Sequence, residues 1–356
     1  MLSFLPVVLA NRKSLTMQAR FWGLDIGGAN IKIADAIGNA YSLPFELWKH
    51  PEKLQSTLED QFQKLGEKRP IALTMTGELA DCYASKKEGV EHIVQATVKA
   101  AAPFPVLIWQ TPGEFVPPDI ATEFEILTAA SNWHALATWV GRSAPQGTSL
   151  LVDCGTTTTD VIPLLDGVPV PTGRTDFTRL QSDELVYLGS RRTPLCTFQQ
   201  TEALPAPLAA EWFATIEDCM VVTGQFPEQP GNCNTADGRA LTIACSQQRV
   251  ARQFCCDATD FTTEQLSEIA QQFINQVTGR IASAMLKVIA AQASPPELII
   301  TSGSGEFLIQ EALKQTTLST TSTLSLSSMC SPQAAECACA MACAILAEER
   351  IGVATS

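Results

Sequence analysis

The sequence predicts an α/β fold in which two like domains face each other across a cleft. Three observations predict it. A strand, a glycine turn and a second strand occupy residues 21–35, and the same order returns at 151–168. A third glycine turn, at 301–305, follows an apolar run that is typical of a buried strand. A repeat of such long period indicates a duplicated domain rather than a solenoid.

The first copy combines an aspartate with a turn suited to phosphate groups. Asp25 ends the first strand, and Gly27 and Gly28 follow where a side chain would clash with the turning backbone. Backbone N–H groups of such a turn point inward and favour phosphate oxygens. Asp25 could hold a Mg²⁺ ion that bridges the phosphates, and Asn30 and Lys32 complete this predicted phosphate site. Taken alone, the copy is equally compatible with a hairpin that binds no ligand.

The second copy matches the first without a gap. The aligned pairs are Asp25 with Asp153, Gly27 with Gly155, and Lys32 with Asp160. Two-residue hairpin turns also align, at 38–39 and 166–167. The second predicted phosphate turn comprises Gly155, Thr156, Thr157 and Thr158. Two facing turns, each with its own aspartate, predict one cleft between two like domains, with Asp25 and Asp153 as the candidate metal ligands.

The composition fits two hydrophobic cores and excludes some partners. Hydrophobic residues make up 46% of the 356 residues, and the net charge is −13. Such an acidic chain is a poor partner for nucleic acid or an anionic membrane, whereas a locally positive cleft can still bind a small phosphorylated molecule. The 12 cysteines are scattered and form no CxxC pair, which favours reduced thiols in the cytoplasm. A zinc site at the cysteines of 330–343 is the less favoured alternative.

The chain divides into four segments. Residues 1–19 are interpreted as an unstructured extension or as a start assigned too early, with Met17 as the initiator. Their apolar run is too short to span a membrane, and its positive charges follow the run instead of preceding it. The first domain is expected at 20–145 and the second at 146–332. A C-terminal helix at 333–356 should pack near the cleft, and the oligomeric state stays open, a homodimer included.

Further candidate site residues follow predicted strands. Glu78 and Asp81 come after a short buried strand at 70–76, and ligands of open α/β sheets bind at the carboxyl ends of strands. A helix cap is an alternative role of equal weight for Glu78. A lone histidine in a helix, His134, is interpreted as a packed residue. The remaining candidates are two arginines suited to phosphate or carboxylate, and two glycines at a helix N-terminus: Arg192, Arg239, Gly303 and Gly305.

The three glycine turns stand in the order used by the sugar kinase, Hsp70 and actin superfamily, which the chain resembles after Met17. The resemblance implies two ribonuclease-H-like domains, the actin-like ATPase fold, around a central cleft. The loops at 23–28 and 155–161 are similar to those of the hydantoinase A/oxoprolinase branch, although the chain is far shorter than those subunits. Five motifs look more like a smaller group, the tetrahydromethanopterin-linked C1-transfer proteins and their archaeal counterparts in methanofuran biosynthesis: 76–81, 132–136, 185–189, 192–194 and 235–239.

This resemblance implies a transferase that joins an aminomethylfuran-methyl diphosphate to the phenol of a glutamylated tyramine or tyrosine and releases diphosphate. Mg²⁺ on Asp25 or Asp153, with donors of the two glycine turns, would neutralise the leaving group, and Glu78 or Asp160 would take the phenol proton. Lys32 would mark the use of diphosphate rather than ATP. Substrate contacts are expected from Asp81, Arg192, Arg239, Gly303 and Gly305.

Two other functions remain open at the level of the sequence. One is an ATP-dependent small-molecule kinase or hydantoinase/oxoprolinase-like enzyme that binds ATP in the same cleft. The other is a nucleotide-binding clamp that opens and closes without chemistry. A clamp requires a protein partner, and the sequence contains no large exposed apolar helix or extra domain that would bind one.

Overall fold

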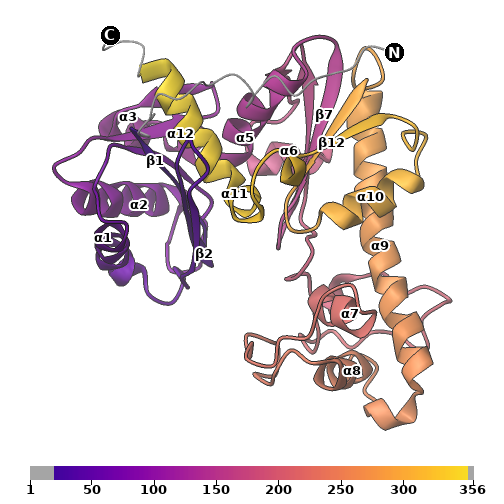
Figure 1. Cartoon of the computed structure of the whole chain (residues 1–356). Helices are drawn as coiled ribbons and strands as arrows, with labels where there is room; N and C mark the ends of the chain where they lie inside the picture. Colours follow the sequence, from indigo (N-terminus) through magenta and orange to yellow (C-terminus); the bar gives the residue numbers. More distant parts are fainter. Residues whose placement is uncertain (1–19, 352–356) are drawn as a thin grey trace.

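The computed structural model describes residues 20–351, so the predictions for residues 1–19 and for the last five residues lie outside the described part. Two sheets organise the chain (Figure 1). The first has the strand order β3-β2-β1-β4-β5-β6. Its strands are β1 (Trp22–Ile26), β2 (Asn30–Ala34), β3 (Ala40–Pro44), β4 (Ile71–Met75), β5 (Val106–Gln110) and β6 (Glu114–Val116).

The second sheet has the order β10-β8-β7-β11-β12, and β9 pairs with β8. Its strands are β7 (Thr148–Cys154), β8 (Thr159–Leu165), β9 (Val168–Pro169), β10 (Leu185–Val186), β11 (Leu298–Ser302) and β12 (Ser322–Ser325). The α-helices are α1 (Leu54–Lys64), α2 (Lys86–Ala101), α3 (Pro118–Glu123), α4 (Glu125–Thr128), α5 (Asn132–Val140), α6 (Asp176–Ser182), α7 (Ile216–Val222), α8 (Ile243–Arg252), α9 (Thr263–Ala290), α10 (Glu306–Lys314), α11 (Pro332–Glu336) and α12 (Ala338–Ile351).

The predicted duplication is present in the strand registers. In the antiparallel pair β1–β2, Asp25 lies opposite Lys32. In the antiparallel pair β7–β8, Asp153 lies opposite Asp160. Each first strand also has a parallel neighbour, β4 beside β1 and β11 beside β7. The alignment made from residue order is therefore confirmed by the pairing of the strands.

Helices α5 and α12 lie between the two sheets (Figure 1). On the second sheet, Leu151 faces this middle layer, whereas Leu150 and Val152 face α9 and α10 on the outside. On the first sheet, Leu24 and Ile26 face α1 and α2. Alternate side chains of each central strand thus enter different cores, because successive strand residues point to opposite faces.

Helix α12 approaches β1 closely, although it follows the second sheet in the chain. A Cβ atom added at Gly23 would lie 1.9 Å from the carbonyl oxygen of Ala340. Only a residue without a side chain fits there. The small residues of α12 therefore allow the C-terminal helix to join the second half of the chain to the first.

Two predicted helices are interrupted. The sequence predicts one helix over 125–140, but Ala130 adopts a φ of 47° between α4 and α5. A non-glycine residue in this left-handed region ends the helix because it breaks the repeating backbone geometry. The predicted helix from residue 333 is likewise divided into α11 and α12 at Cys337.

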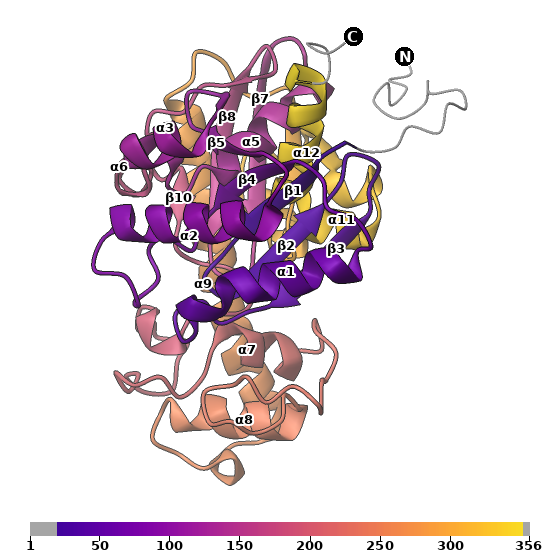
Figure 2. The same cartoon turned by 90° about the vertical axis from the view of Figure 1, so that its left-hand side faces the viewer.

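A helical lobe extends from the second sheet (Figures 1 and 2). We use this name for residues 194–262, which contain α7 and α8 and pack against the first half of α9. The sequence predicts the long helix α9 but not this lobe. No helix among residues 20–351 is long and apolar enough to cross a membrane.

Candidate active site

The two glycine turns adopt the same hydrogen bonding. The Gly27 N–H donates to the Asn30 carbonyl at 2.9 Å, and the Gly155 N–H donates to the Thr158 carbonyl at 2.9 Å. Among the described residues, the N–H groups of Gly28 and of its counterpart Thr156 donate to no backbone acceptor. Each turn therefore offers unpaired donors at its tip, as an anion site requires.

The third glycine turn packs on the second. The Gly305 N–H donates to the Cys154 carbonyl at 2.8 Å, so it is not available to an anion. A Cβ atom at Gly303, whose φ is 93°, would lie 2.8 Å from Oδ1 of Asp153. The glycines of this turn thus permit its close approach to Asp153, and Gly303 also lines the cleft described below.

A fourth segment, 189–192, lies at the site, and the sequence analysis predicts only its Arg192 as a site residue. A Cβ atom at Gly189 would lie 2.5 Å from the Thr157 nitrogen. The N–H groups of Arg191 and Arg192 both donate to the Thr156 carbonyl, at 3.1 and 2.9 Å. The only local signal is a glycine after an apolar run, which does not identify its partner.

These turns border a cleft of about 1910 Å³ that lies between the first domain on one side and the second domain with its helical lobe on the other. Seven of the predicted site residues line it: Asn30, Lys32, Asp153, Gly155, Thr156, Arg192 and Gly303. The others lie outside its lining: Asp25, Gly27, Gly28, Glu78, Asp81, Thr157, Thr158, Asp160, Arg239 and Gly305. Asp25 is opposite Lys32 in the first hairpin, so it lies next to the cleft although it does not line it.

Lys32 faces an aspartate from each domain. Burial alone would lower the pKa of Lys32, but the charges of Asp25 and Asp153 outweigh it and the pKa is raised. Burial, together with the charge of the neighbouring Asp160, raises the pKa of Asp153 to about 6. Within residues 20–351, Lys32 makes no ion pair or hydrogen bond, so its ammonium group is available to a ligand.

Asp25 and Asp153, the two predicted Mg²⁺ ligands, are close enough that, besides burial, the charge of Asp25 raises the pKa of Asp153. Asp25 is 6% exposed, and its Oδ1 atom has no hydrogen-bond partner. Burial raises its pKa, while Lys32 and Asn132 lower it. No cluster of three or more acidic, cysteine or histidine side chains in the described part could hold a metal by itself, which also leaves the zinc alternative without support there. Two carboxylates suffice for Mg²⁺ when water and phosphate oxygens supply the other ligands.

Asp160 is held by an ion pair. Its Oδ1 atom accepts a hydrogen bond of 2.6 Å from Nη2 of Arg179, which is itself 1% exposed. The guanidinium group lies over the ring of Trp133, 4.1 Å from its centroid. Burial raises the pKa of Asp160 and Arg179 lowers it. This arrangement gives Asp160 a structural partner that the sequence did not indicate.

Glu78 has no such partner. It is 1% exposed, burial raises its pKa to about 7, and its Oε2 atom makes no hydrogen bond. The preceding Gly77 touches the first glycine turn, since a Cβ atom there would lie 3.1 Å from the carbonyl carbon of Gly27. The helix-cap alternative is wrong, because Ser85 caps α2 by accepting from the Glu88 N–H at 3.2 Å. Asp81 lies exposed in the intervening turn.

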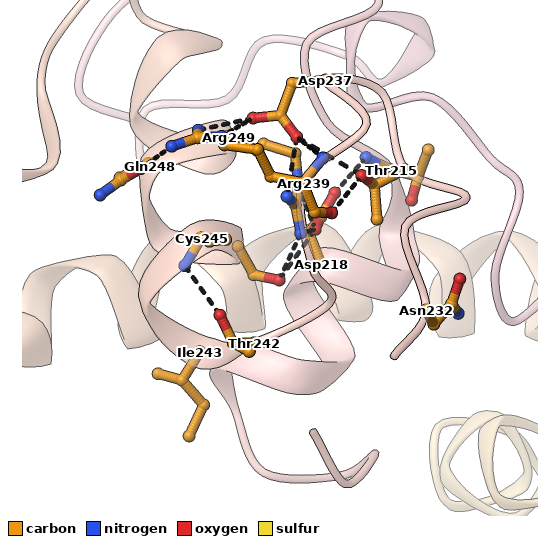
Figure 3. Close-up of polar contacts among 12 residues, drawn as sticks. Thr215, Asp218, Asn232, Asp237, Arg239, Thr242, Ile243, Cys245, Gln248 and Arg249 are labelled. Carbon is orange, nitrogen blue, oxygen red and sulfur yellow. Dashed lines mark hydrogen bonds and ion pairs between the residues drawn. The ribbon is translucent and has the colours of Figure 1, made fainter. Parts of the chain in front are cut away.

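Arg239 lies in a polar network of the helical lobe (Figure 3). Its Nε atom donates to Oδ2 of Asp237 at 2.7 Å. Buried Arg249 joins Asp237 and Asp218, at 3.0 and 2.8 Å. The structure therefore places Arg239 among protein partners. His134 packs against Trp109 and Trp133, as expected of a packed residue.

Comparison with known proteins identifies relatives of this architecture. The profile of the hydantoinase/oxoprolinase family matches residues 69–350. The (4-{4-[2-(gamma-L-glutamylamino)ethyl]phenoxymethyl}furan-2-yl)methanamine synthase of Methanocaldococcus jannaschii is 32% identical over 305 residues, which are 84% of this chain and 90% of that protein. The synthase of the same name from Methanococcus vannielii is 30% identical over 173 residues, 48% of this chain and 77% of that protein.

Among solved structures, nucleotide-free acetone carboxylase matches with a TM-score of 0.50 at 14% identity. The match covers 84% of this chain and 46% of that one, so the chain spans about half of the acetone carboxylase subunit. This likeness concerns the fold alone. The two sheets with their shared middle helices form two ribonuclease-H-like domains of the actin-like ATPase fold, as predicted.

Proposed function

The chain belongs to the hydantoinase/oxoprolinase family, and from this premise we propose that it is a transferase that forms an ether and releases diphosphate. The substrates are an aminomethylfuran-methyl diphosphate and the phenol of a glutamylated tyramine or tyrosine. The carbon–oxygen bond to diphosphate breaks, the phenol oxygen bonds to the furan-methyl carbon, and the phenol proton passes to a carboxylate. The names of the two methanogen synthases, which describe a phenoxymethyl-furan product, support this choice.

The observation that carries the proposal is the unpaired ammonium group of Lys32 between the glycine turns. Lys32 lines the cleft with Asn30 of the first turn and with Gly155 and Thr156 of the second. A cation flanked by free backbone N–H groups suits the several negative charges of a diphosphate. As the leaving group departs, these donors stabilise its growing charge, which is the largest contribution such a site can make to the rate.

Asp25 and Asp153 would hold Mg²⁺ in this site. When bound, the ion supplies further charge neutralisation to the diphosphate oxygens. The chain's own contribution is to orient the diphosphate, since Lys32 approaches it from the first domain and Arg192 lines the cleft on the side of the second.

In this proposal Glu78 accepts the phenol proton through a water molecule, because its carboxylate is buried behind the first glycine turn and does not line the cleft. Its pKa of about 7 matches the range in which a general base works near neutral pH. Asp160 is already paired with Arg179. In this proposal the reaction is a cytoplasmic step of methanofuran or methylofuran synthesis, which serves tetrahydromethanopterin-linked C1 transfer.

The test is acceptor-dependent diphosphate release. Purified protein with Mg²⁺ receives the furan-methyl diphosphate with glutamyl-tyramine, and a parallel sample receives ATP with the same acceptor. We expect diphosphate release that requires the acceptor and no ATP. Release of ADP or AMP instead would establish the ATP-dependent alternative, and binding of nucleotide without turnover would favour a clamp.

Two variants identify the residues that act. Lys32→Gln should reduce kcat/KM about 100-fold, the usual loss for one donor to a developing charge. Lys99→Gln changes an exposed lysine on α2 and serves as the matched control. If both variants keep the wild-type rate, Lys32 is not the diphosphate ligand.

A further inference from the structure

One face of α1 forms a wall of the cleft. Cleft-lining residues recur at the spacing of a single helical face: Lys53, Thr57, Asp60, Gln61 and Lys64. Lys53 and Lys64 make no ion pair among the described residues, whereas the nearby Lys49 pairs with Glu46 at 2.8 Å. The wall also carries one carboxylate, Asp60, so its two unpaired lysines leave it with a net positive charge in a chain of net charge −13. A net positive wall favours an anionic ligand.

The opposite wall combines an aromatic ring with amide groups. Trp212 is 55% exposed and lines the cleft. Asn232 and Asn234 line it from the loop at 229–236. Tryptophan surface of this kind is costly to leave in water, and a ligand with an aromatic ring would cover it.

The 229–236 loop is anchored by the polar network of the helical lobe, which Figure 3 shows. Arg249, with no exposed surface, bonds both Asp218 of α7 and Asp237 beyond the loop. Thr235 Oγ1 donates to the Arg239 carbonyl at 2.7 Å. The Leu241 N–H donates to the Asn232 carbonyl at 2.8 Å. A buried charge network rigidifies the segments that it joins, so this wall is fixed before a ligand arrives.

The cleft also has room for a second substrate. Its volume of about 1910 Å³ is larger than that of most single-ligand pockets, which lie at roughly 300–1,000 Å³. The diphosphate site at Lys32 and Asp153 occupies only one part of the lining. The α1 face, Trp212 and the 229–236 loop remain for the other substrate.

We propose that these elements form the acceptor subsite, which binds an aromatic amine derivative carrying a carboxylate. Trp212 contacts the aromatic ring, and Lys53 and Lys64, at the two ends of the α1 wall, attract the carboxylate into the cleft. The inference rests on the proposed function, because it assigns the phenolic substrate to this part of the same cleft. The lobe network acts as a positioning device, since its residues hold the loop and do not touch the substrate.

The experiment compares two acceptors, glutamyl-tyramine and tyramine, which differ by the glutamyl group and of which only the first carries a carboxylate. The wild type should prefer glutamyl-tyramine. Lys53→Gln and Lys64→Gln should each raise its KM by about threefold, and the double variant by about tenfold, as expected for partly exposed charge pairs. The KM for tyramine and for the diphosphate substrate should not change. Lys99→Gln, outside the cleft, is the control.

A second pair of variants tests the aromatic contact. Trp212→Ala should raise the KM for both acceptors by about tenfold, whereas Trp212→Phe should retain most of the affinity. If Trp212 had only a structural role, Trp212→Ala would lower the stability of the protein, and the KM values of Trp212→Ala and Trp212→Phe would not differ.

The proposal is overturned if the lysine variants change the KM for the two acceptors by the same factor. Should the wild type show no transfer at all, the proposed function fails, and calorimetric binding of glutamyl-tyramine still decides the subsite. Binding that the double lysine variant weakens would support the subsite, and no binding, or binding that is unchanged in the double variant, would refute it.

Discussion

Replacing Glu78 by glutamine should stabilise the folded protein at alkaline pH while it removes the proposed base. The side chain is 1% exposed, and one carboxylate oxygen has no hydrogen-bond partner. Burial is the main cause of its raised pKa; Lys86 lowers the pKa and Asp176 raises it. A neutral amide of the same shape avoids the penalty of burying a charge.

The magnitude follows from the shift of the pKa from 4.5 to about 7. At 1.36 kcal/mol per unit, the ionised form costs the folded state about 3 kcal/mol. The sign follows from linkage: the folded pKa exceeds the unfolded value, so the penalty is absent below about pH 4.5 and complete above about pH 7. The wild type should therefore lose this stability as the pH rises, and the variant should not.

Urea denaturation at pH 5 and pH 8.5 measures the difference. We expect Glu78→Gln to exceed the wild type by about 3 kcal/mol at pH 8.5 and by much less at pH 5. Glu91→Gln removes a carboxylate from helix α2 and serves as the matched control. An equal effect of Glu78→Gln at both pH values would refute the argument. If Glu78→Gln is more stable than the wild type but has lost transferase activity, the loss of activity is due to the missing base and not to unfolding.

Three further substitutions test the packing around the site. Gly23→Ala should destabilise the protein by about 3 kcal/mol, because its methyl group would overlap the Ala340 carbonyl. Thermal denaturation measures the loss, and Gly231→Ala, whose methyl group would meet no atom within 4 Å, is the control. Arg179→Met should cost about 3 kcal/mol by leaving Asp160 buried and unpaired, and Asp160→Asn in the same chain should recover most of the loss in urea denaturation. Arg249→Met should speed hydrogen exchange in the 229–241 loop, whereas unchanged exchange would show that the network does not hold it.

Features that depend on residues within one short segment could be predicted from the sequence. The match of Asp25 with Asp153 depends on residue order within a short segment, and both strand registers confirm it. The apolar stripe of residues 262–293 predicts one long helix, and the structure contains it as α9, Thr263–Ala290, because such a stripe is likewise a local signal. The glycine turns and the cleft between two like domains follow from the same kind of signal.

Features that depend on distant segments could not be predicted. Arg179 reaches Asp160 from a separate helix, and its stacking on Trp133 joins the two domains. Gly189 is required by the backbone of Thr157, which lies on another turn. The left-handed φ of Ala130 has no local cause, since alanine favours a helix. In each case a segment far away in the sequence, and not the residue's own neighbours in the chain, determines the structural role of the residue.

The two halves of the duplication differ in charge at one matched position. Lys32 stands opposite Asp25 in the first hairpin, whereas Asp160 stands opposite Asp153 in the second. Two copies of the first half, placed face to face, would set lysine against lysine, and two copies of the second would gather four carboxylates. Juxtaposed like charges disfavour such pairings by several kcal/mol. The unlike charges at this matched position therefore favour the pairing of the two different halves over a pairing of two like halves.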